Sequence, residues 1–121
     1  MNNTIKNIHT MENFSEYLHR ELVVTTMIRI AERCTHFKIG KTGQSLEDRF
    51  SAKEYQDNYD HIEELDSSDD EKEISDIEGK CIDRAMKLFP NKCDNKKGGE
   101  DSLEDQMKDD ASTYRVYIVY K

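Results

Sequence analysis

The chain has 121 residues, a length that suits one domain with one modest core. Hydrophobic residues make up 35% of it and charged residues 36%, so part of the chain is expected to be solvated loop or tail. No apolar run approaches the roughly 20 residues that cross a bilayer, and we expect no membrane partner. The net charge of −8 argues against a protein that binds nucleic acid over its whole surface.

The charge is unevenly spread along the chain. Acidic residues crowd into 57–76 and 100–110, whereas 38–41 and 92–97 are locally basic. A small basic face on an acidic body fits this pattern, and so does an acidic protein that never contacts nucleic acid. The first ten residues contain no apolar signal segment, which predicts a cytoplasmic protein, in a cell or in a virus-infected host.

Three cysteines without a CxxC spacing fit a reducing compartment better than a disulfide framework. A zinc site built from Cys34, His36, Cys81 and Cys93 would have no recognisable ligand spacing.

The first elements are a helix and a hairpin. We expect residues 1–21 to be a polar segment with a short helix over 11–20, followed by a domain over 22–121. The β-branched, apolar run at 22–31 predicts a strand. A polar turn follows it, and 36–40 predicts a second short strand that pairs with the first.

Helices and strands then alternate. Ser45 is a candidate N-cap for a helix over 45–55, and 58–66 predicts a weaker strand. Ser68 begins a capping-box pattern ahead of the longest expected helix, 69–89. Its apolar residues recur every three or four positions and form one stripe: Ile74, Ile77, Cys81, Ala85 and Leu88.

Residues 113–120 predict a strong closing strand, whereas 100–111 give no clear signal. The expected fold is α/β, with a mainly antiparallel sheet of three to four strands flanked by helices. We expect the sheet to contain 22–31, 36–40 and one of 58–66 or 113–120.

Several short motifs occur along the chain in a characteristic order. Phe37-Lys-Ile-Gly-Lys-Thr42 follows an apolar strand-like run, Arg49 and Glu78 lie in expected helices, and Asn95 begins a glycine-ended loop. This order over about 22–99 resembles the GIY-YIG nuclease family, and the second motif is similar to that of its phage- and virus-associated branch. The resemblance implies a GIY-YIG-like fold and hydrolysis of DNA phosphodiester bonds.

Each matched residue has a chemical role under this resemblance. Glu78 corresponds to the family's metal ligand, for Mg²⁺ or Mn²⁺, because a carboxylate on a rigid helix can hold a hard cation. Arg49 corresponds to the arginine that stabilises transition-state charge on the phosphate. Lys38 replaces the second tyrosine of the family signature and is a candidate contact for water or phosphate.

The turn after that strand adds candidate phosphate contacts. Gly40 lacks a side chain, so a phosphate or another part of the chain can approach closely, and Lys41 follows it. Asn95 corresponds to the late family asparagine that braces the active site, with Asn91 as its rival.

One position departs from the family pattern. By spacing, the first-motif tyrosine falls near Ile28, and isoleucine cannot help to take a proton from water. Either another group replaces it or this copy is inactive. The candidates are His36, since histidine is the side chain that most often serves as a general base, and a tyrosine from the last strand.

Three functional readings follow. The first is a metal-dependent DNA endonuclease, with DNA as its partner. The second is a GIY-YIG-fold protein that has lost catalysis and binds a protein, as an acidic phage or viral inhibitor or DNA mimic would. The third is a small α/β interaction domain unrelated to nucleases. The sequence does not specify an oligomeric state.

Overall fold

The computed structural model describes residues 3–96 and 111–121. Most of the ambiguous stretch 100–111, together with Gly98 and Gly99, therefore lies outside the described residues. Within these residues, seven elements follow one another: α1 (Asn3–Arg33), β1 (Phe37–Thr42), α2 (Leu46–Phe50), α3 (Lys53–Asn58), β2 (His61–Ser68), α4 (Glu71–Leu88) and β3 (Tyr114–Tyr120).

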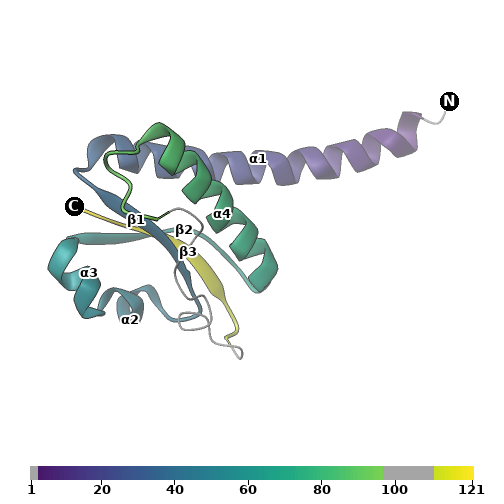
Figure 1. Cartoon of the computed structure of the whole chain (residues 1–121). Coiled ribbons are helices and arrows are strands. Elements are labelled where there is room, and N and C mark those ends of the chain that lie inside the picture. The colour runs from purple at the N-terminus through teal and green to yellow at the C-terminus, as the bar shows by residue number, and fades with distance from the viewer. Residues whose placement is uncertain (1–2, 97–110) are drawn as a thin grey trace.

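The three strands form one antiparallel sheet in the order β1-β3-β2 (Figure 1). This confirms an α/β fold with a small antiparallel sheet flanked by helices. The strands expected over 36–40, 58–66 and 113–120 all belong to the sheet. The last strand along the chain, β3, is the central one and pairs with both of the others.

The prediction of a strand at 22–31, and of a hairpin with 36–40, was wrong. These residues belong to α1, which runs without interruption from Asn3 to Arg33. The run contains a helical pattern as well as β-branched residues: Val23, Val24, Met27 and Ala31 are buried on one face. Packing of that face decides the structure, because strand propensity is weak and depends on context.

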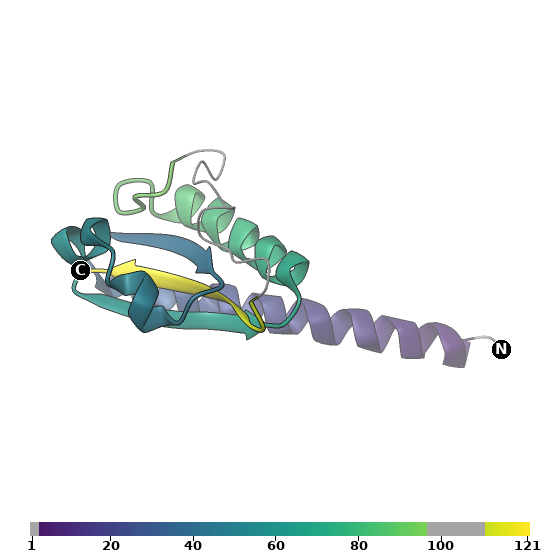
Figure 2. The same cartoon turned by 90° about the horizontal axis from the view of Figure 1, so that it is seen from below.

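Helix α1 also extends well beyond the sheet towards the N-terminus (Figures 1 and 2). It passes through residues 21 and 22, where the sequence suggested that the domain begins. Leu22 on this helix is 67% exposed, so the apolar run is not buried on all sides. No helix in residues 3–96 or 111–121 combines the length and the apolar character needed to span a membrane.

The sheet has a different helix layer on each face (Figure 1). Helices α1 and α4 pack on one face and share a core with alternate residues of β3, Val116 and Ile118. Helices α2 and α3 lie on the other face, where Tyr55 packs with the intervening β3 residues, Tyr117 and Val119. The central strand therefore presents apolar or aromatic side chains to both sides, as a strand buried on two faces must.

Helix boundaries differ slightly from the expected ones. Ser45 caps α2 as predicted, its hydroxyl accepting a bond from the Asp48 amide. The helix expected over 45–55 is instead two short helices that break at Ser51. Asp70, rather than Ser68, is the N-cap of α4.

The outer edge of β1 is covered by the segment that follows α4. The Phe37 amide donates to the Lys92 carbonyl at 3.0 Å, and the Asp94 amide donates to the Phe37 carbonyl at 2.7 Å. The Asn95 side chain adds two further hydrogen bonds to this edge, both to Ile39. The edge of β1 is thus satisfied without a fourth strand.

The burial of α4 makes a stability prediction. Ile77 and Cys81 are buried as expected, at 1% and 0% exposure, whereas Leu88 at the end of the stripe is 51% exposed. Ile77→Ala should lower the free energy of unfolding by about 2–5 kcal/mol, because it leaves a cavity in the main core. Leu88→Ala, measured by the same chemical denaturation, should cost far less. Equal costs would contradict the assignment of the buried face.

Candidate functional site

Strand β1 carries the motif residues on alternate faces. Phe37 and Ile39 enter the core under α1 and α4. Lys38 and Gly40 therefore face α2 and α3, where Lys38 Nζ lies 3.9 Å from a carboxylate oxygen of Glu54. In the sheet register, Gly40 lies opposite Tyr117 of β3.

The Tyr117 ring fills the space that a side chain at Gly40 would occupy. A Cβ added to Gly40 would lie 2.5 Å from Cζ of this ring, far inside van der Waals contact. Close approach is therefore the reason for glycine here, and the neighbour is a tyrosine of the central strand.

Arg49, Tyr55 and Tyr117 form a hydrogen-bonded cluster on this face. Arg49 Nε donates to the Tyr117 hydroxyl at 3.0 Å, and Arg49 Nη2 donates to the Tyr55 hydroxyl at 3.1 Å. The two hydroxyls share a further bond of 2.6 Å. The guanidinium also lies over the Tyr55 ring, 4.5 Å from its centroid, as cation–π pairs do.

Both tyrosines of the cluster are fully buried, whereas Arg49 is partly exposed. Burial raises the pKa of the Tyr117 phenol well above its ordinary value, and the neighbouring Tyr55 adds to the shift. Tyr117 is therefore a neutral phenol near neutral pH. It can donate or accept a hydrogen bond, but it does not supply a phenolate.

His36 lies at the start of β1 beside a second tyrosine. Its Nδ1 is 2.5 Å from a carboxylate oxygen of Asp94, and its ring lies 5.0 Å from the Tyr59 ring, centroid to centroid. The Tyr59 hydroxyl donates to the same Asp94 oxygen at 2.7 Å. Burial and this bond raise the pKa of Tyr59 above its ordinary value. A histidine held by a carboxylate is oriented as a general base would be.

Lys41 and Glu78 lie on the opposite face of β1, towards α4. Lys41 is 2% exposed, and its ammonium donates to the Ser75 hydroxyl and lies 3.9 Å from a Glu78 carboxylate oxygen. Lys41 is thus a buried partner of α4 rather than an open phosphate contact. The structure does not bring Glu78 into the Arg49 cluster, although Gly40 and Lys41 are adjacent in the strand.

The Asn95 side chain hydrogen-bonds to the outer edge of β1 in the way that a neighbouring strand would. The Ile39 amide donates to Asn95 Oδ1 and Asn95 Nδ2 donates to the Ile39 carbonyl, each at 2.8 Å. Asn95 is 7% exposed, whereas its rival Asn91 is exposed. The bracing residue is therefore Asn95, and it holds the strand between Lys38 and Gly40 in place.

The structure gathers Lys38, Gly40 and Arg49 on one face and adds two residues that the motif order did not single out, Tyr55 and Tyr117. The sequence carried a signal for Tyr117, because it lies in the strongest strand pattern of the chain. Ile28, the position assigned to the missing tyrosine, is in α1 and has no place in the sheet.

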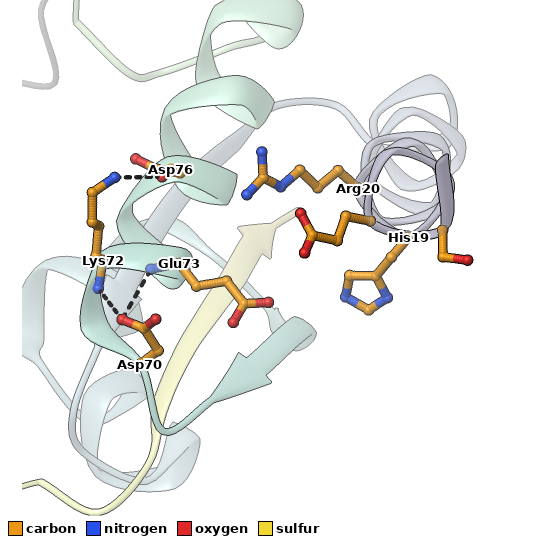
Figure 3. A pocket seen from close by; sticks show the side chains of 8 residues that line it. His19, Arg20, Asp70, Lys72, Glu73 and Asp76 are labelled. Atoms are coloured by element: carbon orange, nitrogen blue, oxygen red, sulfur yellow. Dashed lines mark hydrogen bonds and ion pairs between the residues drawn. The ribbon is translucent and has the colours of Figure 1, made fainter. Parts of the chain in front are cut away.

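A separate polar hollow lies between α1 and the start of α4 (Figure 3). Its carboxylates are largely engaged: Asp70 accepts from the Lys72 and Glu73 amides as the helix cap, and Asp76 pairs with Lys72 at 3.1 Å. We assign no chemistry to it. Within residues 3–96 and 111–121, no three or more His, Cys, Asp or Glu side chains are grouped as a metal site would require.

Comparisons with family models, with curated proteins and with solved structures give no match for this chain.

Alanine substitutions at Gly40 and at Gly79 should change the free energy of unfolding in opposite directions. Gly40→Ala should lower the free energy of unfolding by about 1–3 kcal/mol, because its Cβ displaces the buried Tyr117 ring. Gly79→Ala is the control, since nothing lies within 4 Å of the added Cβ on α4. It should stabilise the protein by up to about 1 kcal/mol, because alanine is the better helix former. Thermal and chemical unfolding measure both, and a stabilising Gly40→Ala would contradict the described contact.

Proposed function

We propose that the chain is a GIY-YIG-like, metal-dependent DNA endonuclease in which the last strand supplies the first-motif tyrosine. The candidate is Tyr117, within Arg115-Val116-Tyr117 in the middle of β3; this stretch resembles the family's Gly-Ile-Tyr in its β-branched residue and its tyrosine and departs from it at the glycine. In this reading the strand that comes first in the family order comes last in this chain.

The observation that carries the proposal is the position of Tyr117 opposite Gly40 in an antiparallel pair, bonded to Arg49. Tyr117 of β3, the Lys-Ile-Gly stretch of β1 and Arg49 of α2 thereby lie together, and residues 22–31 contribute nothing to this arrangement. Ile28 lies in α1, so the proposal assigns the first-motif tyrosine to Tyr117 rather than to that position.

Arg49 is the residue best suited to grip the phosphate. It is the partly exposed member of the cluster, and a guanidinium can bind two phosphate oxygens at once. Its hydrogen-bond partners are neutral hydroxyls, and Glu54 is the carboxylate that interacts with it electrostatically. Lys38, on the same face, adds a second positive charge, which Glu54 partly offsets at 3.9 Å.

Glu78 is the residue that would hold Mg²⁺ or Mn²⁺, and it lies towards α4, on the opposite face of β1 from Arg49 and Tyr117. One carboxylate is compatible with Mg²⁺, which keeps most of its waters, although Lys41 already places an ammonium beside it. When bound, the metal supplies an activated water and neutralises charge on the phosphate. His36, held by Asp94, is the further candidate base on the face that carries Arg49.

A catalytically degenerate binding protein is the second candidate. Full burial of the two tyrosine hydroxyls and the close Lys41–Glu78 pair favour it, because these groups satisfy one another. Such a protein would keep the fold and use its acidic surface to bind a protein partner, as an inhibitor or DNA mimic does.

Cleavage of supercoiled plasmid with Mn²⁺ or Mg²⁺ tests the proposal. The wild-type protein should nick or cut the plasmid, and Glu78→Ala should abolish this because the metal ligand is lost. Arg49→Ala should slow it by about a hundredfold or more, since charge stabilisation in the transition state is removed. Tyr117→Phe keeps the ring and removes the hydroxyl that accepts from Arg49, so it should slow cleavage because the guanidinium is no longer held in place.

Glu71→Ala on the same helix as Glu78 is the matched control, because Glu71 is exposed and lies in the first turn of α4. It should cleave as the wild type does. Wild-type protein that cuts no duplex, branched or single-stranded DNA at low salt with Mn²⁺ would reject the nuclease and leave the binding protein.

A further inference from the structure

A second hollow, of about 440 Å³, lies between the C-terminal end of α1 and the sheet end where β2 begins and β3 finishes. Three cationic side chains line it, Arg29, Arg33 and Lys121, against one carboxylate, Glu63. That balance is the reverse of the chain as a whole, whose net charge is −8.

The two arginines are available for a ligand. Arg29 and Arg33 are both exposed and lie four residues apart, so their side chains project from the same side of α1. Among the described residues, neither guanidinium has a hydrogen-bond or ion-pair partner. The exposed lysines Lys53 and Lys87, by contrast, each pair with an acidic residue four positions away.

An aromatic surface adjoins these charges. The His61 and Tyr120 rings lie 5.0 Å apart, centroid to centroid, with their planes 31° from parallel. His61 is exposed and Tyr120 is partly exposed. The Tyr120 hydroxyl donates to Glu63, so the one carboxylate of the hollow is already engaged by a neutral partner.

We propose that this hollow binds a single-stranded nucleic acid segment. Guanidinium groups bind phosphate oxygens bidentately, and exposed rings stack with unpaired bases. Helix C-termini favour basic residues, which alone would explain Arg33, but this does not explain the adjoining ring pair or the lack of acidic partners. The inference goes beyond the hydrolytic site and does not depend on cleavage.

Binding is measured as the fluorescence anisotropy of a labelled oligothymidylate, with EDTA present so that no cleavage occurs. The wild-type protein should bind at low salt and lose affinity as salt rises. Arg29→Gln/Arg33→Gln should weaken binding by about tenfold or more and flatten the logarithmic salt slope by about 1.4, because two phosphate contacts are lost. His61→Ala should weaken it severalfold by removing the stacking surface.

Lys53→Gln/Lys87→Gln is the control, since it removes the same charge from exposed positions outside the hollow. It should bind as the wild type does. The proposal is overturned by absent wild-type binding, by equal loss in the two double variants, or by polyglutamate binding as tightly as the oligonucleotide. The proposal would also be overturned if duplex DNA bound as tightly as the single strand and His61→Ala left the affinity unchanged.

Discussion

The contact between the Tyr117 ring and Gly40 determines much of this structure. It lets the Tyr117 ring lie across β1 on the face covered by α2 and α3, and no larger residue fits at Gly40. It also fixes where the Tyr117 hydroxyl lies, within reach of both Arg49 and Tyr55. The two short helices, which pack Leu46, Phe50 and Tyr55 against the sheet, are thus also held to it by a polar cluster.

The central strand contributes to the main core on one face and to the Arg49 cluster on the other. Val116 and Ile118 fill the core beneath α1 and α4, whereas Tyr117 between them belongs to the cluster around Arg49. A one-residue slip of β3 would exchange these sets and place the phenol in the aliphatic core. Asn95 holds β1 from its other edge, because its side-chain amide bonds to both the N–H and the carbonyl of Ile39.

Local patterns in the sequence predicted most elements but not their arrangement. The α4 stripe, the Ser45 cap and the strands at 36–40 and 113–120 were readable because period and turn chemistry are local signals. The run at 22–31 was misread, since Val23, Val24, Met27 and Ala31 fit a helical face as well as a strand. Strand order was not readable, because nothing near Tyr114–Tyr120 indicates that it pairs with residues far earlier in the chain. Of the candidate site, Lys38, Gly40 and Arg49 were found from motif order, while Tyr55 needed the three-dimensional contact.

The order of strands also constrains how the chain can fold. β1 and β2 do not pair with each other, and both pair with β3, which is separated from them by α4 and the segment after it. Neither strand has a sheet partner until β3 has been synthesised, so the sheet cannot grow progressively from the N-terminus during translation. Such non-local pairing slows folding and leaves strand edges open to association with other chains in the meantime. The acidic side chains of β2, Glu63, Glu64 and Asp66, would repel like strands during that interval.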